Sequence, residues 1–269
     1  MVGDTPCPLP TAAVWRADES WRAIDFISDL HLCEAQPKTF DAWAAYMRRS
    51  AADAIVILGD LFDFWNGDDA GDLPFEGRCL QVLSECAARK WVGLMVGNRD
   101  FLITPALLER CGVRPLQDPT LLDAWRQPLL LTHGDALCLD DVAYQKFRLW
   151  TRSPEVQRDF LSRPLAERLR VAASFRHASE AGRHQTAPAE GSEHPYGDID
   201  LGAAVACLRD AEATRMIHGH THRPGDSPLA TGFDRMVLSD WDLDAGATRA
   251  EVLRCTRSGL ARLSLADTC

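Results

Sequence analysis

The chain has 269 residues, a hydrophobic fraction of 46% and a formal net charge of −10. One large α/β domain over residues 1–269, with a sizeable core, is the simplest organisation for that length. The acidic balance argues against a general nucleic-acid binder, because phosphate backbones attract basic surfaces. Nine cysteines without a Cys-x-x-Cys pair predict reduced thiols, most of them small core residues, rather than a disulfide framework.

The sequence contains no run that approaches the ~18 apolar residues of a membrane span. The proline-rich start around Cys7 lacks both the basic beginning and the apolar core of a signal peptide. We therefore expect a cytoplasmic protein. No feature of the sequence indicates an obligate protein partner.

Apolar runs typical of strands alternate with helical patterns through the first half of the chain, which indicates a parallel sheet. Strands are predicted at Ala23–Ile27, Ala54–Leu58, Trp91–Val96, Leu129–Thr132 and Met216–Ile217. Helices are predicted at Phe40–Ser50 and Arg78–Arg89. Three late runs predict an antiparallel second sheet, namely Arg235–Leu238, Arg249–Leu253 and Leu260–Leu265.

An insertion of about residues 144–184 interrupts this alternation, and its apolar residues recur at helical spacing. Eight arginines against four acids between Phe147 and His184 give it a local charge of +4. One interpretation is an ordinary helical pair with a solvated basic face. The other is a lid over an apolar, anionic substrate that also touches acidic lipid headgroups. Residues 185–198, rich in Pro, Gly, Glu and His, predict a mobile loop.

Metal-type side chains stand in five short blocks, each directly after a predicted strand. The blocks are Asp29-Leu-His31, Gly59-Asp60, Gly97-Asn98-Arg99-Asp100, His133-Gly134-Asp135 and Gly219-His220-Thr221-His222. In open α/β sheets ligands bind beyond the carboxyl ends of the strands, so we expect the blocks to meet there. Carboxylate and amide oxygens with imidazole nitrogens suit Mn, Fe, Zn or Mg. A bridging Asp60 would let seven ligands hold two ions ~3.5–4 Å apart.

Each block alone has a simpler explanation. An Asp after a strand is commonly a helix N-cap, and a single His after an apolar run is more often a hydrogen-bonded core group. Five blocks in this order, each behind its own strand, make coincidence a much weaker explanation than one metal centre.

The order of the blocks resembles that of the calcineurin-like metallophosphoesterases. This resemblance implies an α/β fold, a four-layer αββα sandwich, here with a helical lid insertion. Within that superfamily, the motifs from about Ala23 to Trp241 are similar to those of the UDP-2,3-diacylglucosamine hydrolases of lipid A biosynthesis. They are Ile27–Cys33, Ile57–Phe62, Gly97–Leu102, His133–Cys138, Asp140–Gln145 and Ile217–Pro224.

The resemblance implies two divalent metal ions, most simply Mn²⁺. One ion would be held by Asp29, His31, Asp60 and His222, and the other by Asp60, Asn98, His133 and His220. The implied substrate-binding residues are Asn98, Arg99, Asp141, Ser179 and His220, with Arg183 as a further cation. The catalytic group would be Asp60, Asn98, Arg99 and His220. In the lid the match weakens at Arg183 and Thr186.

The implied reaction is Mn-dependent hydrolysis of the pyrophosphate bond of UDP-2,3-diacylglucosamine by attack at the α-phosphorus. Its products would be UMP and 2,3-diacylglucosamine 1-phosphate. The lipid-linked substrate implies a peripheral position on the cytoplasmic face of the inner membrane. Two competing hypotheses are a metallophosphodiesterase acting on a soluble nucleotide and a non-catalytic scaffold that keeps the fold for protein binding.

Overall fold

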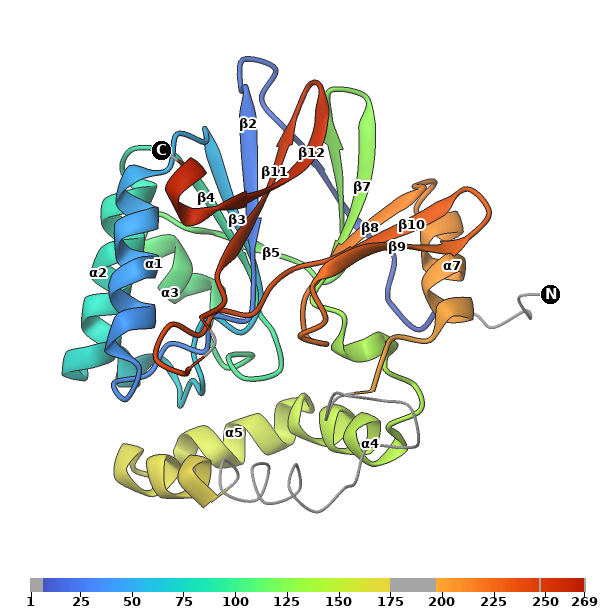
Figure 1. The fold of residues 1–269 in the computed structure, drawn as a ribbon. Coiled ribbons are helices and arrows are strands. Elements are labelled where there is room, and N and C mark those ends of the chain that lie inside the picture. Colours follow the sequence, from blue (N-terminus) through green and yellow to red (C-terminus); the bar gives the residue numbers. More distant parts are fainter. Residues whose placement is uncertain (1–6, 175–196, 247, 269) are drawn as a thin grey trace.

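Two six-stranded sheets face each other in the computed structural model, which describes residues 7–174, 197–246 and 248–268 (Figure 1). The first sheet has the strand order β12-β11-β2-β3-β4-β5. Its strands are β2 (Ala23–Ile27), β3 (Ala54–Leu58), β4 (Trp91–Met95), β5 (Arg114–Leu116), β11 (Glu251–Thr256) and β12 (Gly259–Ser264). The second sheet has the order β1-β6-β7-β8-β10-β9. Its strands are β1 (Ala13–Arg16), β6 (Thr120–Ala124), β7 (Gln127–Thr132), β8 (Arg215–His218), β9 (Gly225–Ala230) and β10 (Phe233–Val237).

Helices cover the outer face of each sheet (Figure 1). The first sheet carries α1 (Pro37–Arg49), α2 (Pro74–Ala87) and α3 (Pro105–Arg110), and the second carries α7 (Leu201–Asp210). The short 3-10 turns are η1 (Asp68–Asp72), η2 (Asp135–Leu137) and η3 (Leu265–Thr268). The predicted four-layer αββα sandwich is confirmed.

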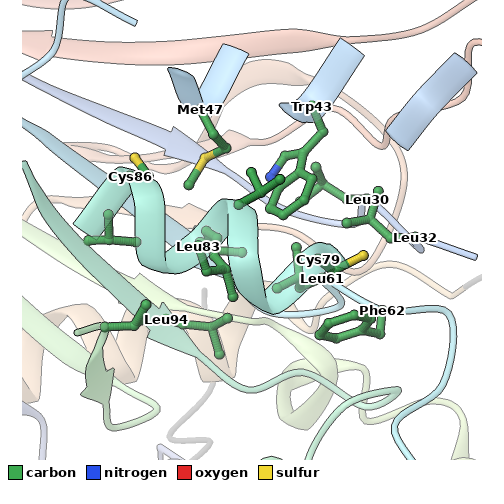
Figure 2. Close-up of a cluster of buried hydrophobic side chains, with 14 of the residues drawn as sticks. Leu30, Leu32, Trp43, Met47, Leu61, Phe62, Cys79, Leu83, Cys86 and Leu94 are labelled. Carbon is green, nitrogen blue, oxygen red and sulfur yellow. The ribbon is translucent and has the colours of Figure 1, made fainter. Parts of the chain in front are cut away.

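Residues that alternate along the central strands face different layers of the core. On β3, Val56 packs between the two sheets, whereas Ile55 and Ile57 pack toward the helices. Strands buried on both faces are apolar throughout, and β3 accordingly reads Ala-Ile-Val-Ile-Leu. On the helix side, Trp43 of α1 and Leu83 of α2 close over the sheet (Figure 2). This two-sided burial fixes the strands whose ends carry the site.

The late strands correct one prediction. β10 pairs parallel to β8 in the second sheet, whereas β11 and β12 extend the first sheet antiparallel to β2. They therefore do not form a sheet of their own. The strands β1, β5, β6 and β9 were not predicted. Burial alternates along β1, β6 and most of β9, and β5 and β9 contain Pro or Gly.

The cysteine prediction was wrong for one pair. Cys7 and Cys207 form a disulfide that ties the N-terminal segment to α7, across 200 residues of sequence. The prediction of core thiols holds for five others, which are buried as thiols: Cys79, Cys86, Cys111, Cys138 and Cys255. Cysteine spacing alone gives no information on pairs so far apart in sequence.

The insertion is helical over its described part and lies across the open end of the sandwich (Figure 1). It begins with α4 (Val142–Thr151) and α5 (Pro154–Ser162), and a further helical stretch covers 165–174. Most of the loop predicted over residues 185–198 falls outside the described residues. Within the described part of the chain, no helix is both long enough and apolar enough to cross a membrane.

Candidate active site

All five predicted blocks directly follow a strand. Two of the strands, β7 and β8, belong to the second sheet, and the other three, β2, β3 and β4, are parallel neighbours in the first. Parallel strands bring their carboxyl ends to one edge, and here the edges of both sheets meet on the side of the sandwich that faces the insertion (Figure 1).

The loops that carry the ligands brace one another through their backbones. The amide of Asp29 donates to Gly59 O at 3.1 Å, and the amide of His31 donates to Asp60 O at 3.0 Å. Five candidate ligands have left-handed backbone angles, with φ between 46° and 64°: Asp29, His31, Asp60, His220 and His222. Such angles cost non-glycine residues free energy and persist only where neighbouring contacts hold them, a pattern found at functional sites.

Two glycines allow this close approach because they lack a Cβ atom. A Cβ on Gly97 would lie 2.2 Å from Asp60 Oδ1, and one on Gly219 would lie 2.3 Å from Asp29 Oδ2. The loops after β4 and β8 therefore press directly against the two central carboxylates.

Asp29, His31 and His222 form the first group of donor atoms, which all lie within 4.8 Å of one another. The Nε2 atoms of His31 and His222 are 3.2 Å apart, and His222 Nε2 lies 3.5 Å from Asp29 Oδ1. Asp29 is fully buried and also accepts the amide of His220 at 3.0 Å. Two imidazole nitrogens at this distance either share a hydrogen bond, in which one ring donates and the other accepts, or can both bind a metal ion as acceptors.

The second group centres on the Asn98 side chain. Its Oδ1 lies 2.9 Å from His133 Nε2 and 2.8 Å from His220 Nδ1. His133 Nε2 also lies 3.7 Å from Asp60 Oδ1, while His133 Nδ1 donates to Leu58 O at 2.9 Å. That bond fixes the ring and directs Nε2 toward the oxygens, as a backbone acceptor does for a metal-bound imidazole.

Burial and mutual charge shift the pKa values of these groups. Burial raises the pKa of Asp60 to about 7. Burial would lower the pKa of His133, but the carboxylates of Asp60, Asp135 and Asp29 outweigh it and raise that pKa to about 9. Burial, with the charge of His133, lowers the pKa of His220 to about 3. Asp29 keeps a pKa below its usual value despite burial, because His222 bonds to it.

This donor set fits two divalent metal ions. Buried carboxylate, amide and imidazole groups converge with their acceptor atoms facing inward, and a cation removes the repulsion between them. Metal ligands must be deprotonated, so binding would displace the proton held near His133 and Asp60. By distance, Asp29 belongs both to the group with His31 and His222 and to a group with Asp60 and His133.

Four residues that carry the site had no predicted role. Ser28 donates its hydroxyl to Asp29 Oδ2. Asp100 accepts the amides of Gly97 at 2.7 Å and Leu61 at 2.8 Å, which joins two ligand loops. Asp240 lies 3.8 Å from His222 Nδ1, and Asp135 holds the insertion. Three of them stand in or beside a predicted block, and Asp240 follows the strand pattern at Arg235–Leu238.

The predicted substrate residues differ in where they lie relative to the candidate metal ligands. Arg99 follows Asn98 in the same turn, and its amide donates to Asp60 Oδ1 at 2.8 Å. Asp141 is exposed, and its side chain caps α4 by accepting the amide of Tyr144 at 2.9 Å. Ser179 and Arg183, together with Thr186, lie outside the described residues.

Residues 23–224 match the calcineurin-like phosphoesterase family, and the chain belongs to that family. Individual relatives narrow the comparison to one group of proteins within that family. A protein of Ralstonia nicotianae named UDP-2,3-diacylglucosamine hydrolase is 44% identical over 235 residues, which cover 85% of this chain and 87% of that protein.

Proteins of the same name show similar identity in other bacteria. The one from Chromobacterium violaceum is 43% identical, covering 81% of this chain and 90% of its own length. The one from Xanthomonas campestris pv. campestris is 40% identical, covering 90% of this chain and 98% of its own. The family resemblance drawn from the motifs is thereby confirmed.

Proposed function

We propose that this protein hydrolyses the pyrophosphate bond of UDP-2,3-diacylglucosamine with the help of two divalent metal ions. The relatives' shared name supports the substrate, and the family supports metal-dependent phosphoester chemistry. The single observation that carries the proposal is the convergence of seven metal-type side chains from five strand ends beneath the insertion.

The seven side chains would hold the ions in two sets that share Asp60. One set is Asp29, His31, Asp60 and His222, and the other is Asp60, Asn98, His133 and His220. When bound, the ions supply the Lewis acidity that activates water and neutralises charge on the attacked phosphorus. Mn²⁺ is the ion proposed, because oxygen donors outnumber what a zinc site usually contains.

The protein's own groups would orient the pyrophosphate. The backbone of Arg99 is fixed on both sides, since its amide donates to Asp60 and its carbonyl accepts the amide of Trp65 at 3.0 Å. A guanidinium on so firm a base can clamp phosphate oxygens at two points. Asn98 and His220 contact the same phosphate in this proposal, while Asp141, Ser179 and Arg183 bind the glucosamine side.

The insertion supports the lipid part of the proposal. Five large apolar side chains of its described helices α4 and α5 are exposed: Val142, Phe147, Leu149, Trp150 and Leu161. Each acyl methylene that leaves water against such surface contributes ~0.8 kcal/mol. Attack at the α-phosphorus would release UMP and leave 2,3-diacylglucosamine 1-phosphate, with the protein seated peripherally on the cytoplasmic face of the inner membrane.

The charge of the insertion is less available to a membrane than its sequence predicts. Four arginines of its described part form ion pairs within the protein: Arg148 and Arg152 with Asp135, Arg163 with Asp159, and Arg168 with Asp69. In this proposal the apolar side chains therefore contribute more to lipid contact than the basic ones do.

The test is release of UMP by wild-type protein and by Asp60→Ala, with Mn²⁺ present and UDP-glucose as the control substrate. We expect cleavage of the acylated substrate but not of UDP-glucose, and loss of that cleavage in Asp60→Ala. Cleavage of simple phosphodiesters or soluble nucleotides without any UMP from the acylated substrate would favour a soluble-nucleotide enzyme. Failure to bind metal at all would favour the scaffold.

A further inference from the structure

One carboxylate accepts several of the hydrogen bonds that attach the inner face of α4 to the core. Asp135 is fully buried, and its Oδ2 accepts hydrogen bonds from Tyr144 Oη and Arg148 Nε, both at 2.8 Å, and from Arg152 Nη2 at 3.1 Å. Gln145 adds bonds to the carbonyls of Asp135 at 2.8 Å and Cys138 at 3.1 Å. The donors recur at helical spacing, so this face of α4 is devoted to docking.

Arg152 extends the attachment to the ligand turn, residues Gly97–Asp100. The same Nη2 atom that reaches Asp135 donates to Gly97 O at 3.0 Å, and the guanidinium lies 5.5 Å from the centre of the Phe101 ring. Gly97 directly precedes Asn98 and contacts the Asp60 carboxylate. Arg152 is thus the point at which the insertion holds the turn that carries Asn98 and Arg99.

We propose that Asp135 and Arg152 are positioning residues that fix the Gly97–Asp100 turn to the base of the insertion. This inference rests on the proposed function, because it concerns the same site. Asp135 aligns the guanidinium, and the guanidinium holds the Gly97 carbonyl. A displacement of α4 by bound substrate would then also move the turn that carries Asn98 and Arg99.

The charges of Asp135, Arg148 and Arg152 strengthen the hydrogen bonds between them. Bonds between ionised partners are about twice as strong as neutral ones, and a buried charge deprived of its partner is strongly destabilising. Asp135 faces two guanidinium groups. Within the described part of the chain, the guanidinium of Arg148 hydrogen-bonds to Asp135 and not to the ligand turn. Arg148 serves to dock the helix, whereas Arg152 both docks it and supports the turn.

The kinetic test compares Arg152→Gln with Arg152→Lys and with the control Arg158→Gln, whose exposed side chain bonds to Pro154 O of its own helix. The substrates are UDP-2,3-diacylglucosamine and a small aryl phosphodiester without acyl chains. We expect Arg152→Gln to lower kcat about 10- to 100-fold for both, the range for loss of a charged hydrogen bond. Arg152→Lys should recover part of kcat, because it keeps the charge without the fork.

A purely docking role predicts a different pattern. It would raise KM for the acylated substrate and leave the small phosphodiester unchanged, and that result would overturn the inference. If wild-type protein cleaves the small ester but not the acylated one, the proposed substrate fails while the small ester still tests Arg152.

Amide hydrogen exchange of the metal-free protein gives a second readout that needs no activity. The peptide spanning Gly97–Phe101 should exchange faster in Arg152→Gln and in Asp135→Asn than in wild type, and at the wild-type rate in Arg158→Gln. Equal protection in Arg152→Gln and wild type would overturn the inference. Should Asp135→Asn fail to fold, the Arg152 variants decide alone.

Discussion

Gly97→Ala places a methyl group where two ligand loops touch. The added Cβ would lie 2.2 Å from Asp60 Oδ1 and 2.6 Å from the Asp60 amide nitrogen. Such contacts do not fall below 3.0 Å, so the carboxylate oxygen must move by about 0.8 Å, from 2.2 Å to 3.0 Å. A misplacement of about 1 Å in a catalytic arrangement costs about 100-fold in rate.

We expect Gly97→Ala to lower kcat for a small phosphodiester by about 100-fold and to weaken binding of at least one Mn²⁺ ion. Overpacking should cost about 1–3 kcal/mol of unfolding free energy, so the fold survives. Gly246→Ala is the matched control, because no atom of the described residues lies within 4 Å of its added Cβ. Kinetics, metal titration and thermal unfolding check the three effects. Wild-type kcat with full metal content in Gly97→Ala would refute this reasoning.

Three further predictions concern the scaffold. Arg168→Gln removes the buried guanidinium that bonds to Asn66 O and Asp69, so the attachment of helix 165–174 should weaken by about 1–3 kcal/mol. Amide exchange in that helix should become faster, and unchanged protection would contradict this prediction. Burial by itself would raise the pKa of Asp198, but the bidentate pair with Arg235 outweighs burial and lowers that pKa. The stability that Asp198→Asn loses should therefore be present above pH ~4 and vanish as pH falls through the lowered pKa, which urea titrations at several pH values measure. A gap that persisted below pH ~2 would contradict this sign. Reducing the Cys7–Cys207 disulfide should lower unfolding free energy by about 2–5 kcal/mol while kcat stays unchanged, since Cys207 belongs to α7, which covers the outer face of the second sheet. Loss of activity on reduction, with Cys7→Ser as its non-reducible control, would contradict that separation.

The strands that carry ligands could be predicted because burial on both faces makes them largely apolar. β2 and β3 are buried at every position, and their predicted bounds match the observed ones. Edge strands gave a weaker signal. β1 has only four residues, and β9 contains Gly, Asp, Ser and Pro, so neither exceeded the signal of a loop. The distribution of β10, β11 and β12 over two sheets depends on long-range pairing, which local pattern does not encode.

The candidate ligands could be listed from sequence, but the contacts between them could not. The 3.2 Å approach of His31 and His222 joins residues 191 positions apart. The role of Asp135 was equally hidden, because its partners Arg148 and Arg152 looked like part of a solvated basic face. Charge counts along a helix do not reveal which charges meet a buried carboxylate.

Hydrolysis of UDP-2,3-diacylglucosamine in ¹⁸O-labelled water, with Mn²⁺ present, tests the central claim most directly. Mass spectrometry of both products reports the substrate, the bond broken and the phosphorus attacked. We predict one ¹⁸O atom in UMP and none in 2,3-diacylglucosamine 1-phosphate. Label in the lipid product would contradict attack at the α-phosphorus, and absence of both products from active, metal-loaded protein would contradict the proposed substrate.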